Sequence, residues 1–331
     1  MIRRYLALKR AGVMGLNARN GQYIMRYNQR KFYPLVDDKI RSKKVLQAHA
    51  IAVPDLLDEI RTQHGAGHLA KRLASLSEFV IKPASGSGGD GIIVISKYRN
   101  ERWLSPGGKS YSLDDLQFHV SGILNGMYSL AGQPDAAMFE ALVHPDPILR
   151  ELAPEGVPDI RVIIYRGIPV MAMMRLPTRQ SGGRANLHQG AIGVGIDMAT
   201  GRTLCGVMES RIIDQHPDSG FQVANFQVPD WNALLDLSAR CQKAVGLGYL
   251  GVDIVLDEQR GPLVLELNAR PGLAIQIANQ SGLERRIKAV DRIPEPEKIS
   301  PEARLDWLNL LAENDWLWTK PPAQPPSVQN Q

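Results

Sequence analysis

Residues 251–268, with the sequence GVDIVLDEQRGPLVLELN, decide the fold. Two short runs rich in Val, Ile and Leu flank the polar segment 257–261, and this pattern predicts a β-hairpin. Successive side chains of a strand point to opposite faces, so Glu266 and Asn268 share one face of the second strand. Asp253 lies on the first strand of the same hairpin.

The predicted pairing of this hairpin brings three oxygen-bearing side chains together. A turn centred between Gln259 and Arg260 places Asp253 opposite Glu266, and paired residues point to the same side of a sheet. Two facing carboxylates repel each other unless a positive charge lies between them. Hard oxygen ligands suit Mg²⁺, so Asp253, Glu266 and Asn268 are candidate magnesium ligands. The alternative is an exposed polar face whose charge a nearby Lys or Arg balances.

A glycine-rich segment, KPASGSGGDG at residues 82–91, lies between two β-rich runs. Its four glycines within residues 86–91 let the backbone approach a ligand and turn N–H groups toward an anion, which favours phosphate. Lys82, at the end of the preceding strand, is well placed to contact phosphate oxygens. The segment is neither a P-loop nor a dinucleotide fingerprint, because no Gly-Lys-Ser/Thr follows and it leads into a strand. A flexible hairpin tip is the alternative interpretation.

The rest of the chain predicts a mixture of helices and strands. We expect helices over about residues 3–14, 66–75, 112–130 and 231–245, the last capped by Asp230, and further helices that begin at Asp38 and Ser300. We expect strands over residues 79–82, 92–95, 138–143, 159–165 and 169–175, the last two joined as a hairpin by Arg166-Gly167. Loops are expected over residues 144–158 and 181–195, and a disordered tail from Pro321.

The composition excludes several classes of protein. At 331 residues the chain is about twice the usual ~150-residue domain, and its 44% hydrophobic and 22% charged residues argue against disorder and coiled coil. Cys205 and Cys241 are its only cysteines, too few for a disulfide framework or a CxxC zinc site. No apolar run approaches the ~18 residues that span a bilayer. We therefore expect a cytoplasmic protein that is not transmembrane.

The net charge of +5 arises from 39 Lys and Arg against 34 Asp and Glu, a mild excess that a site for anionic nucleotides would also use. Only residues 1–31 carry charges of a single sign, with eight basic residues and no acidic one. This basic arm is a candidate contact for an acidic protein partner or membrane lipid, and a solvated terminal arm is the alternative. No basic helix interleaved with aromatic residues appears, so we expect no nucleic acid as a partner.

Five motifs, taken in order, resemble those of the ATP-grasp superfamily, and most closely those of the RimK-type α-L-glutamate ligases. They are Asp38-Lys39-Ile40-Arg41-Ser42, Lys82 with the glycine-rich segment, Asp159-Ile160-Arg161, RANLHQG at residues 184–190, and the hairpin continued through Arg270-Pro271-Gly272-Leu273. The match covers roughly residues 37–285. It implies an α+β ATP-grasp fold, in which two α+β sub-domains grip ATP.

The resemblance implies that one set of positions binds ATP through its phosphates, base and sugar. The phosphate ligands would be Lys39, Lys82, Ser85, Gly86, Gly88 and Gly89. The adenine would lie at the hinge formed by Glu140, Ala141 and Leu142, with Asp159 on the sugar side. Arg184 and Asn186 would contact the phosphates or the acyl intermediate.

The resemblance also implies two magnesium ions on Asp253, Glu266 and Asn268, in agreement with the hairpin argument, with Mn²⁺ as a possible substitute. Arg161, Arg175 and Arg184 would face the transferred phosphate. A surface salt bridge is the alternative for Arg161 and Arg175.

Two departures from the family pattern bear on the domains and the substrate. Family ligases carry an α/β pre-domain before the Asp-Lys motif, and 37 residues precede Asp38 here, so we expect that domain to be missing or reduced to an arm. Arg270 stands where the ribosomal-protein ligases carry a small residue, so substrate identity is not inherited. The predicted domains are a basic arm at 1–37, an ATP-grasp domain at 38–290 with a nucleotide lid at about 79–137 and a metal-binding sub-domain at about 138–290, and a C-terminal helix and disordered tail at 291–331.

The function implied by the resemblance is that of an ADP-forming carboxylate–amine ligase that adds glutamate or another amino acid to an acceptor through an acylphosphate. An ATP-grasp phosphotransferase would use the same nucleotide site. A nucleotide-binding scaffold module without its own substrate domain is the third hypothesis. The sequence does not specify which carboxylate and which amine are joined.

Overall fold

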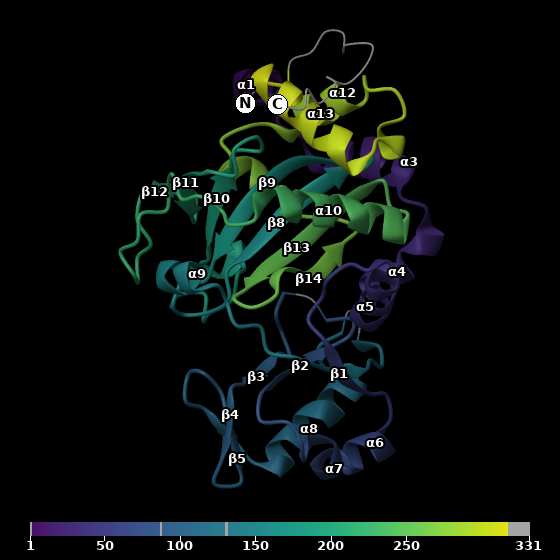
Figure 1. Cartoon of the computed structure of the whole chain (residues 1–331), viewed down its shortest axis with the longest axis vertical. Helices are drawn as coiled ribbons and strands as arrows, with labels where there is room; N and C mark the ends of the chain where they lie inside the picture. Colours follow the sequence, from purple (N-terminus) through teal and green to yellow (C-terminus); the bar gives the residue numbers. More distant parts are fainter. Residues whose placement is uncertain (1, 87, 130–131, 317–331) are drawn as a thin grey trace.

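The computed structural model describes residues 2–86, 88–129 and 132–316, and it forms a large and a small lobe (Figure 1). The large lobe contains a seven-stranded antiparallel sheet in the order β12-β11-β10-β9-β8-β13-β14. Its strands are β8 (Asp159–Tyr165), β9 (Ile168–Leu176), β10 (Ile192–Ile196), β11 (Thr203–Met208), β12 (Arg211–Ile213), β13 (Tyr249–Asp257) and β14 (Gly261–Asn268). The expected hairpins at Arg166-Gly167 and at 257–261 are confirmed.

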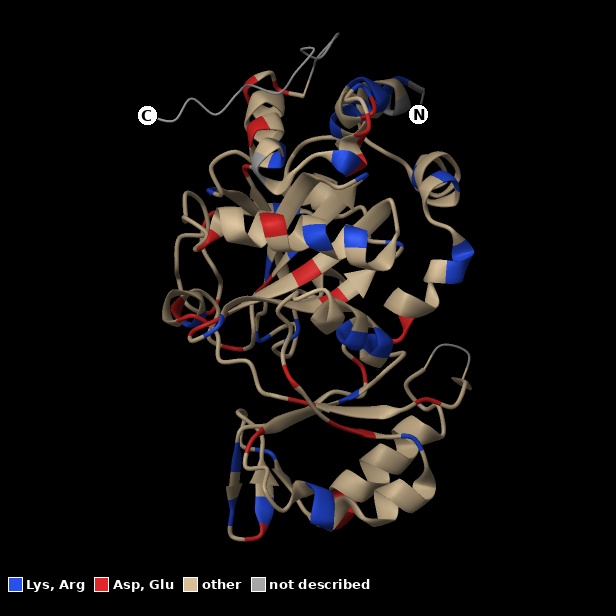
Figure 2. Cartoon of the chain, turned by 45° about the vertical axis from the view of Figure 1, so that its right-hand side comes forward, with Lys and Arg blue, Asp and Glu red and all other residues tan. Residues whose placement is uncertain are grey.

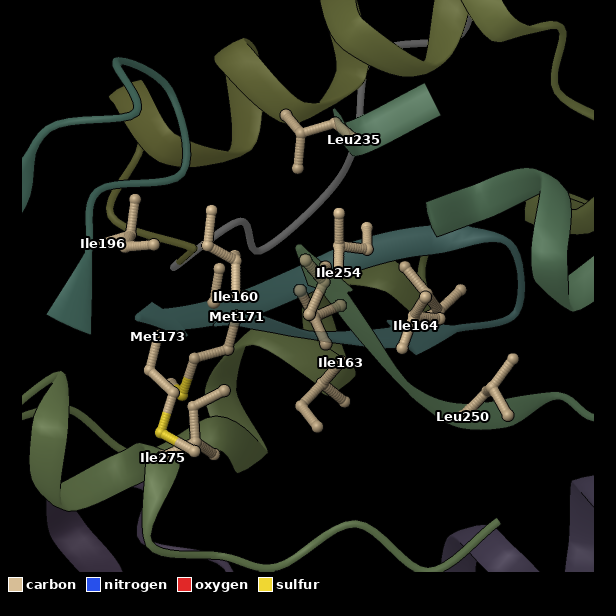
Figure 3. Packing of buried hydrophobic residues seen from close by; sticks show 14 of the residues in the cluster. Ile160, Ile163, Ile164, Met171, Met173, Ile196, Leu235, Leu250, Ile254 and Ile275 are labelled. Atoms are coloured by element: carbon tan, nitrogen blue, oxygen red, sulfur yellow. The ribbon is translucent and has the colours of Figure 1, made fainter. Parts of the chain in front are cut away.

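Helices cover both faces of this sheet, which explains why its central strands are apolar on both sides. Helix α10 (Trp231–Val245) packs on β8, β9, β13 and β14, whereas α11 (Ile275–Ala278) and α12 (Leu283–Val290) pack on β9 and its neighbours. Figure 3 shows Leu235 of α10 and Ile275 of α11 on opposite sides of the strands. The sheet therefore lies between two helical layers.

The small lobe is built on a four-stranded sheet in the order β1-β7-β2-β3 with its own hydrophobic core. Its strands are β1 (Leu56–Ile60), β2 (Phe79–Pro83), β3 (Ile93–Ile95) and β7 (Ala137–Glu140), and a separate three-stranded sheet contains β4 (Lys97–Arg99), β5 (Arg102–Leu104) and β6 (Ser110–Tyr111). Helix α8 (Leu113–Leu124) packs on β2 and β7, and α6 (Gln63–Gly67) and α7 (Leu69–Leu73) pack on α8. The expected Ser112 capping box begins α8. Helix α5 (Lys39–Ala48) lies between the lobes, and Asp38 caps it as expected.

The segment before Asp38 is not a solvated arm beyond its first helix. It contains α1 (Ile2–Arg10), α2 (Leu16–Ala18), the π-helix η1 (Arg19–Ile24), α3 (Met25–Tyr27), η2 (Arg30–Phe32) and α4 (Pro34–Asp37). Met14, Tyr23 and Ile24 are buried in the core of the large lobe. The Tyr23 and Tyr27 rings pack edge-on against Tyr165 of β8. Burial of these side chains against the sheet is the reason that the basic segment stays folded onto the large lobe.

The C-terminal helix α13 (Pro301–Glu313) begins at Ser300 as expected, and the Ser300 hydroxyl accepts a hydrogen bond from the Ala303 amide. It follows the short helix η5 (Pro296–Lys298). The tail expected from Pro321 lies outside the described residues. Within residues 2–86, 88–129 and 132–316, no helix combines the length and apolar character needed to cross a bilayer.

Several expected elements differ from those observed. Asp230 does not cap α10 through its side chain, because it takes a left-handed conformation with φ +52°. Helix α9 (Pro147–Leu152) occupies part of the expected loop, since Pro147 opens it and the Asp146 carboxylate accepts from the Ile148 amide. Strand β10 likewise lies within the expected loop at 181–195, and two short helices, α6 and α7, replace the helix expected over 66–75.

Candidate active site

The β13–β14 hairpin pairs Asp253 with Glu266, as the sequence predicts. The register at the tip of the hairpin differs from the predicted one. Asp257 pairs with Gly261, so the turn is centred on Gln259. A one-residue register shift follows, and the extra residue is Leu265. This β-bulge returns Glu266 to its place opposite Asp253 and leaves Leu265 partly exposed in a crevice lined by α5 and β14.

Two arginines from neighbouring strands enclose Asp253, which is 2% exposed. Arg161 of β8 donates from Nε and Nη2 to its two carboxylate oxygens at 2.7 and 2.5 Å. Arg175 of β9 donates to Asp253 Oδ2 at 2.8 Å and binds both oxygens of Asp159 at 2.5 Å. Asn268 Nδ2 donates to Asp253 Oδ2 at 3.2 Å. Strands β8, β9 and β13 thus build one buried network of two carboxylates and two guanidinium groups, and β14 adds the Asn268 amide.

The network separates the proton affinities of its two carboxyls. Burial alone would raise the pKa of Asp253, but Arg161 and Arg175 outweigh it and hold that pKa below its usual range. Burial, together with the repulsion from Asp253, raises the pKa of Asp159, and the attraction of Arg175 and Arg161 does not offset it. Asp253 therefore carries a full negative charge at neutral pH, as a metal ligand must.

The candidate magnesium ligands lie on the paired strands β13 and β14. No group of three or more His, Cys, Asp or Glu side chains gathers at one point in the part of the chain that the structure describes. Asp253, Glu266 and Asn268 instead supply two carboxylates and an amide, all hard oxygen donors on one edge of the sheet. The Asn268 amide directs its nitrogen at Asp253 and so turns its oxygen away. Both oxygens of Asp253 are held by guanidinium groups, so Glu266, whose side chain is 34% exposed, is the accessible carboxylate, and Mg²⁺ binding at this hairpin stays a prediction.

Lys39 joins the glycine-rich segment to the hairpin. Its Nζ donates to Gly86 O at 2.5 Å and lies 3.4 Å from Glu266 Oε1. The Lys39 amide donates to Ala84 O at 2.9 Å, which fixes the start of α5 against the same segment. Lys39 therefore connects the candidate phosphate loop to a candidate metal ligand, and Lys39 and Glu266 both line the crevice between α5 and β14.

The tip of the glycine-rich segment reaches across to the 181–190 loop of the large lobe. Arg184 Nη1 lies 3.3 Å from Asp90 Oδ1. A Cβ at Gly89, where φ is +82°, would lie 3.5 Å from Arg184 Cδ, and one at Gly88 would lie 4.0 Å from the Asn186 amide nitrogen. Arg184 and Asn186, expected beside the phosphates, are thus brought next to the loop.

The expected adenine hinge is only partly free. The Ala141 amide donates to Asp55 O at 2.9 Å, because β1 pairs with the other edge of β7. The Glu140 carboxylate is buried between two lysines, with Lys82 Nζ at 2.7 Å and Lys43 Nζ at 2.5 Å. Leu142 is half-buried. Contact between the hinge and adenine, like that of the buried Asp159 with a sugar, stays a prediction.

Sequence reasoning missed Lys43 and the role of the N-terminal segment. Lys43 follows Lys39 by four residues in a helix and so shares its face, a spacing that could have identified it. Arg19 donates to Pro271 O at 2.8 Å and Asn28 binds the backbone of Tyr249 and Ala269, which pins the chain just beyond Asn268. Single polar residues in an irregular segment carry no periodic signal, so these contacts could not be read from the sequence.

Residues 18–292 match the sequence model of a family described as sugar-transfer associated ATP-grasp. The chain belongs to this family. Its two lobes, each built on its own sheet, form an ATP-grasp fold. No curated protein matches the sequence.

Several solved structures resemble this member of the sugar-transfer associated ATP-grasp family. The ATP-grasp ligase PsnB complexed with a minimal precursor is 15% identical, with a TM-score of 0.42 over 79% of this chain and 60% of PsnB. D-alanine–D-alanine ligase from Bacillus anthracis is 15% identical, with a TM-score of 0.43 over 86% of this chain and 71% of that enzyme. D-cycloserine synthetase DcsG is 14% identical, with a TM-score of 0.43 over 78% and 70%. The chain thus spans three-fifths of the PsnB chain, and the family assignment rests on the sequence match alone.

Proposed function

We propose that this chain is an ATP- and Mg²⁺-dependent, ADP-forming ligase that joins a carboxylate to an amine. One observation carries the proposal: Lys39 contacts Gly86 of the glycine-rich segment and lies beside Glu266 of the hairpin. A cation suited to phosphates and a carboxylate suited to Mg²⁺ therefore lie side by side and line the same crevice, which is the arrangement that phosphoryl transfer requires. Membership of an ATP-grasp family supports the use of ATP.

In this proposal the protein acts by positioning and electrostatics. Lys39, Lys82 and the glycine-rich segment hold the phosphates of ATP. Asp253, Glu266 and Asn268 would hold Mg²⁺, which would neutralise the negative charge of the transferred phosphoryl group. A substrate carboxylate oxygen attacks the γ-phosphorus and ADP leaves with the bond's electron pair. An amine then attacks the acyl carbon, inorganic phosphate leaves, and the amine loses a proton as the amide forms.

The three arginines have different parts in this reaction. Arg161 and Arg175 are only 13% and 12% exposed and are already paired with carboxylates, so they keep Asp253 ionised. Arg184 is 45% exposed, beside the glycine-rich segment, and its partner Asp90 is itself exposed. We propose that Arg184 neutralises the negative charge of the acylphosphate, because that charge develops outside the buried network of Asp159 and Asp253.

The identity of the substrates is a finer part of the same proposal. The RimK-type resemblance favours glutamate or another amino acid as one substrate. The family description favours a saccharide-bearing partner as the other substrate, so amino sugars belong in any substrate panel.

Two further proposals concern location and partners. We propose a cytoplasmic location. We also propose an acidic protein partner for helix α1, where Arg3, Lys9 and Arg10 are exposed; Figure 2 shows basic positions on this helix.

The proposal is tested by Mg²⁺-dependent ADP release from ATP. Pools of amino acids, acidic peptides and amino sugars are added in turn, and the products are weighed by mass spectrometry. We expect one pool to stimulate ADP release and yield a product equal to the sum of two substrates minus water. Glu266→Gln should reduce the stimulated rate at least 100-fold, because it removes a charged metal ligand at unchanged size.

Glu258→Gln is the matched control, because Glu258 lies at the tip of the same hairpin and pairs with Arg150 at the surface. It should retain the wild-type rate. A product carrying an added phosphoryl group would establish the phosphotransferase hypothesis instead. Full activity in Glu266→Gln would remove the metal assignment.

A further inference from the structure

Three buried charges lie together where α5 meets strands β2 and β7, and their sum is not zero. Lys43 of α5, Lys82 of β2 and Glu140 of β7 are 3%, 5% and 2% exposed. Lys82 Nζ lies 2.7 Å from Glu140 Oε1, and Lys43 Nζ lies 2.5 Å from Glu140 Oε2. Two cations thus share one carboxylate, which leaves one buried positive charge in excess.

A structural role alone does not account for the second lysine. One lysine suffices to neutralise Glu140, and each further buried ammonium carries a desolvation penalty. Burial lowers the pKa of Lys43 to about 8, in spite of the opposing effect of Glu140. The further hydrogen bond from Lys43 Nζ to Pro54 O, at 2.5 Å, has a neutral acceptor and so does not cancel the excess charge. An apolar residue at position 43 would be the less costly choice for stability.

The two lysines differ in what they can reach. Lys82 ends the strand that leads directly into the glycine-rich segment, whereas Lys43 is anchored between Glu140 and Pro54. If Lys82 turns to a phosphate, Glu140 loses the ion pair at Oε1 and would be an uncompensated buried carboxylate without Lys43. With Lys43 in place, Glu140 keeps one cation at 2.5 Å.

We infer that Lys43 is a positioning residue for ATP: it holds the charge of Glu140 and so frees Lys82 to bind the nucleotide phosphates. The inference rests on the proposed function, in which Lys82 is a phosphate ligand. It predicts that the effect of Lys43 on nucleotide affinity acts through Glu140. Without a carboxylate at position 140, Lys43 should become dispensable.

The test measures the affinity of the full chain for AMP-PNP with Mg²⁺ by calorimetry. Lys43→Met should raise the Kd at least tenfold, because Lys82 is then the only cation on Glu140. The double variant Lys43→Met/Glu140→Gln should return to within about threefold of wild type, because no carboxylate remains to hold Lys82. A lysine that merely supports the fold would give a double variant at least as weak as Lys43→Met.

Lys44→Met is the matched control, since Lys44 is the next residue and pairs at the surface with Glu59. It should bind AMP-PNP like the wild type. Lys43→Arg is a second measurement that does not need Lys43→Met to fold: it keeps a cation beside Glu140 and should bind AMP-PNP within about threefold of the wild type. Thermal unfolding of each variant identifies any that is not folded.

The outcomes separate this inference from the proposed function. If the wild type does not bind AMP-PNP, the proposed function fails and the inference fails with it. If the wild type binds but Lys43→Met binds equally well, the inference alone fails. A double variant no better than Lys43→Met, or a tenfold loss in Lys43→Arg, also overturns it.

Discussion

Arg175 touches two buried carboxylates of the central sheet, Asp159 and Asp253, and they raise its own pKa above the usual range in spite of the burial that opposes it. Removing it would strip Asp159 of its bidentate partner while Asp253 keeps Arg161. The cost should therefore arise mainly at Asp159, the carboxyl whose pKa burial already raises.

We expect Arg175→Met to lower the free energy of unfolding by about 3–5 kcal/mol at pH 7, the usual cost of an unpaired buried charge. Urea unfolding followed by circular dichroism measures this. Arg179→Met is the control, since Arg179 is exposed and pairs with Glu155 at the surface, where a change within about 0.5 kcal/mol is expected. A similar loss in both variants would contradict a special role for the buried network.

The pH dependence of nucleotide affinity should report Lys43. Burial lowers its pKa to about 8, against the attraction of Glu140 and Asp55 and with the repulsion of Lys82. As pH rises through 8, Lys43 loses its proton, Glu140 retains Lys82, and affinity for AMP-PNP should fall severalfold. The free energy of unfolding should change in the opposite direction and rise with pH. Between pH 8 and the unfolded pKa of about 10.4, the unfolded chain binds more protons than the folded one.

Calorimetry between pH 7 and 9.5 measures this change. The Lys43→Met/Glu140→Gln variant has neither titrating partner and should show a flat profile over the same range. An equal decline in both proteins would assign the pH dependence to another group.

At the scale of elements, the N-terminal segment depends on a few polar contacts with the large lobe. The Asn28 amide donates to Tyr249 O at 2.8 Å and to Ala269 O at 3.3 Å, and its oxygen accepts from the Tyr249 amide at 2.8 Å. Asn28 is 3% exposed, so its removal leaves buried backbone groups without partners. The same contacts hold the chain beside Asn268.

We expect Asn28→Ala to lower the free energy of unfolding by about 2–3 kcal/mol, the cost of orphaned buried donors and acceptors. Urea unfolding is again the measurement. Asn17→Ala, at an exposed position of the same segment, should change stability by less than about 0.5 kcal/mol. A destabilised Asn17→Ala would indicate that the segment is sensitive throughout rather than pinned at Asn28.

How far the sequence predicts these elements depends on how local their determinants are. The hairpin, the Asp38 and Ser112 caps and helix α10 follow from short-range periodicity and capping residues, and the structure confirms them. Strand β1 was missed because LLDEI alternates poorly and becomes a strand only by pairing with β7. The pairing of Asp253 with Glu266 was predictable, but its enclosure by Arg161 and Arg175 depends on strand order in the sheet, which periodicity does not specify.

At the scale of the whole molecule, the two lobes have separate hydrophobic cores. Among the described residues, the Asp90–Arg184 ion pair links the tip of the glycine-rich segment to the large lobe. Both side chains are about half exposed, so the pair contributes little to stability. Its effect should appear in how long the loop stays closed over a bound nucleotide.

We expect Asp90→Asn to raise the dissociation rate of AMP-PNP about two- to fivefold while the melting temperature of the free protein stays unchanged. Stopped-flow displacement measures the rate. Asp114→Asn, at an exposed position of α8 in the same lobe, should leave it as in the wild type. An unchanged rate in Asp90→Asn would mean that the loop closes without this pair.

The bulge at Leu265 also has an evolutionary consequence. Deleting that one residue would straighten β14 and still leave Glu266 opposite Asp253, because the tip register already matches a hairpin without the extra residue. Relatives can therefore gain or lose a residue here and keep the same acidic pair, so a search that fixes the interval between these two carboxylates would overlook some of them. The inserted residue is also one of those that line the crevice, which makes it a position where lineages can vary the shape of the site without disturbing the strand pairing.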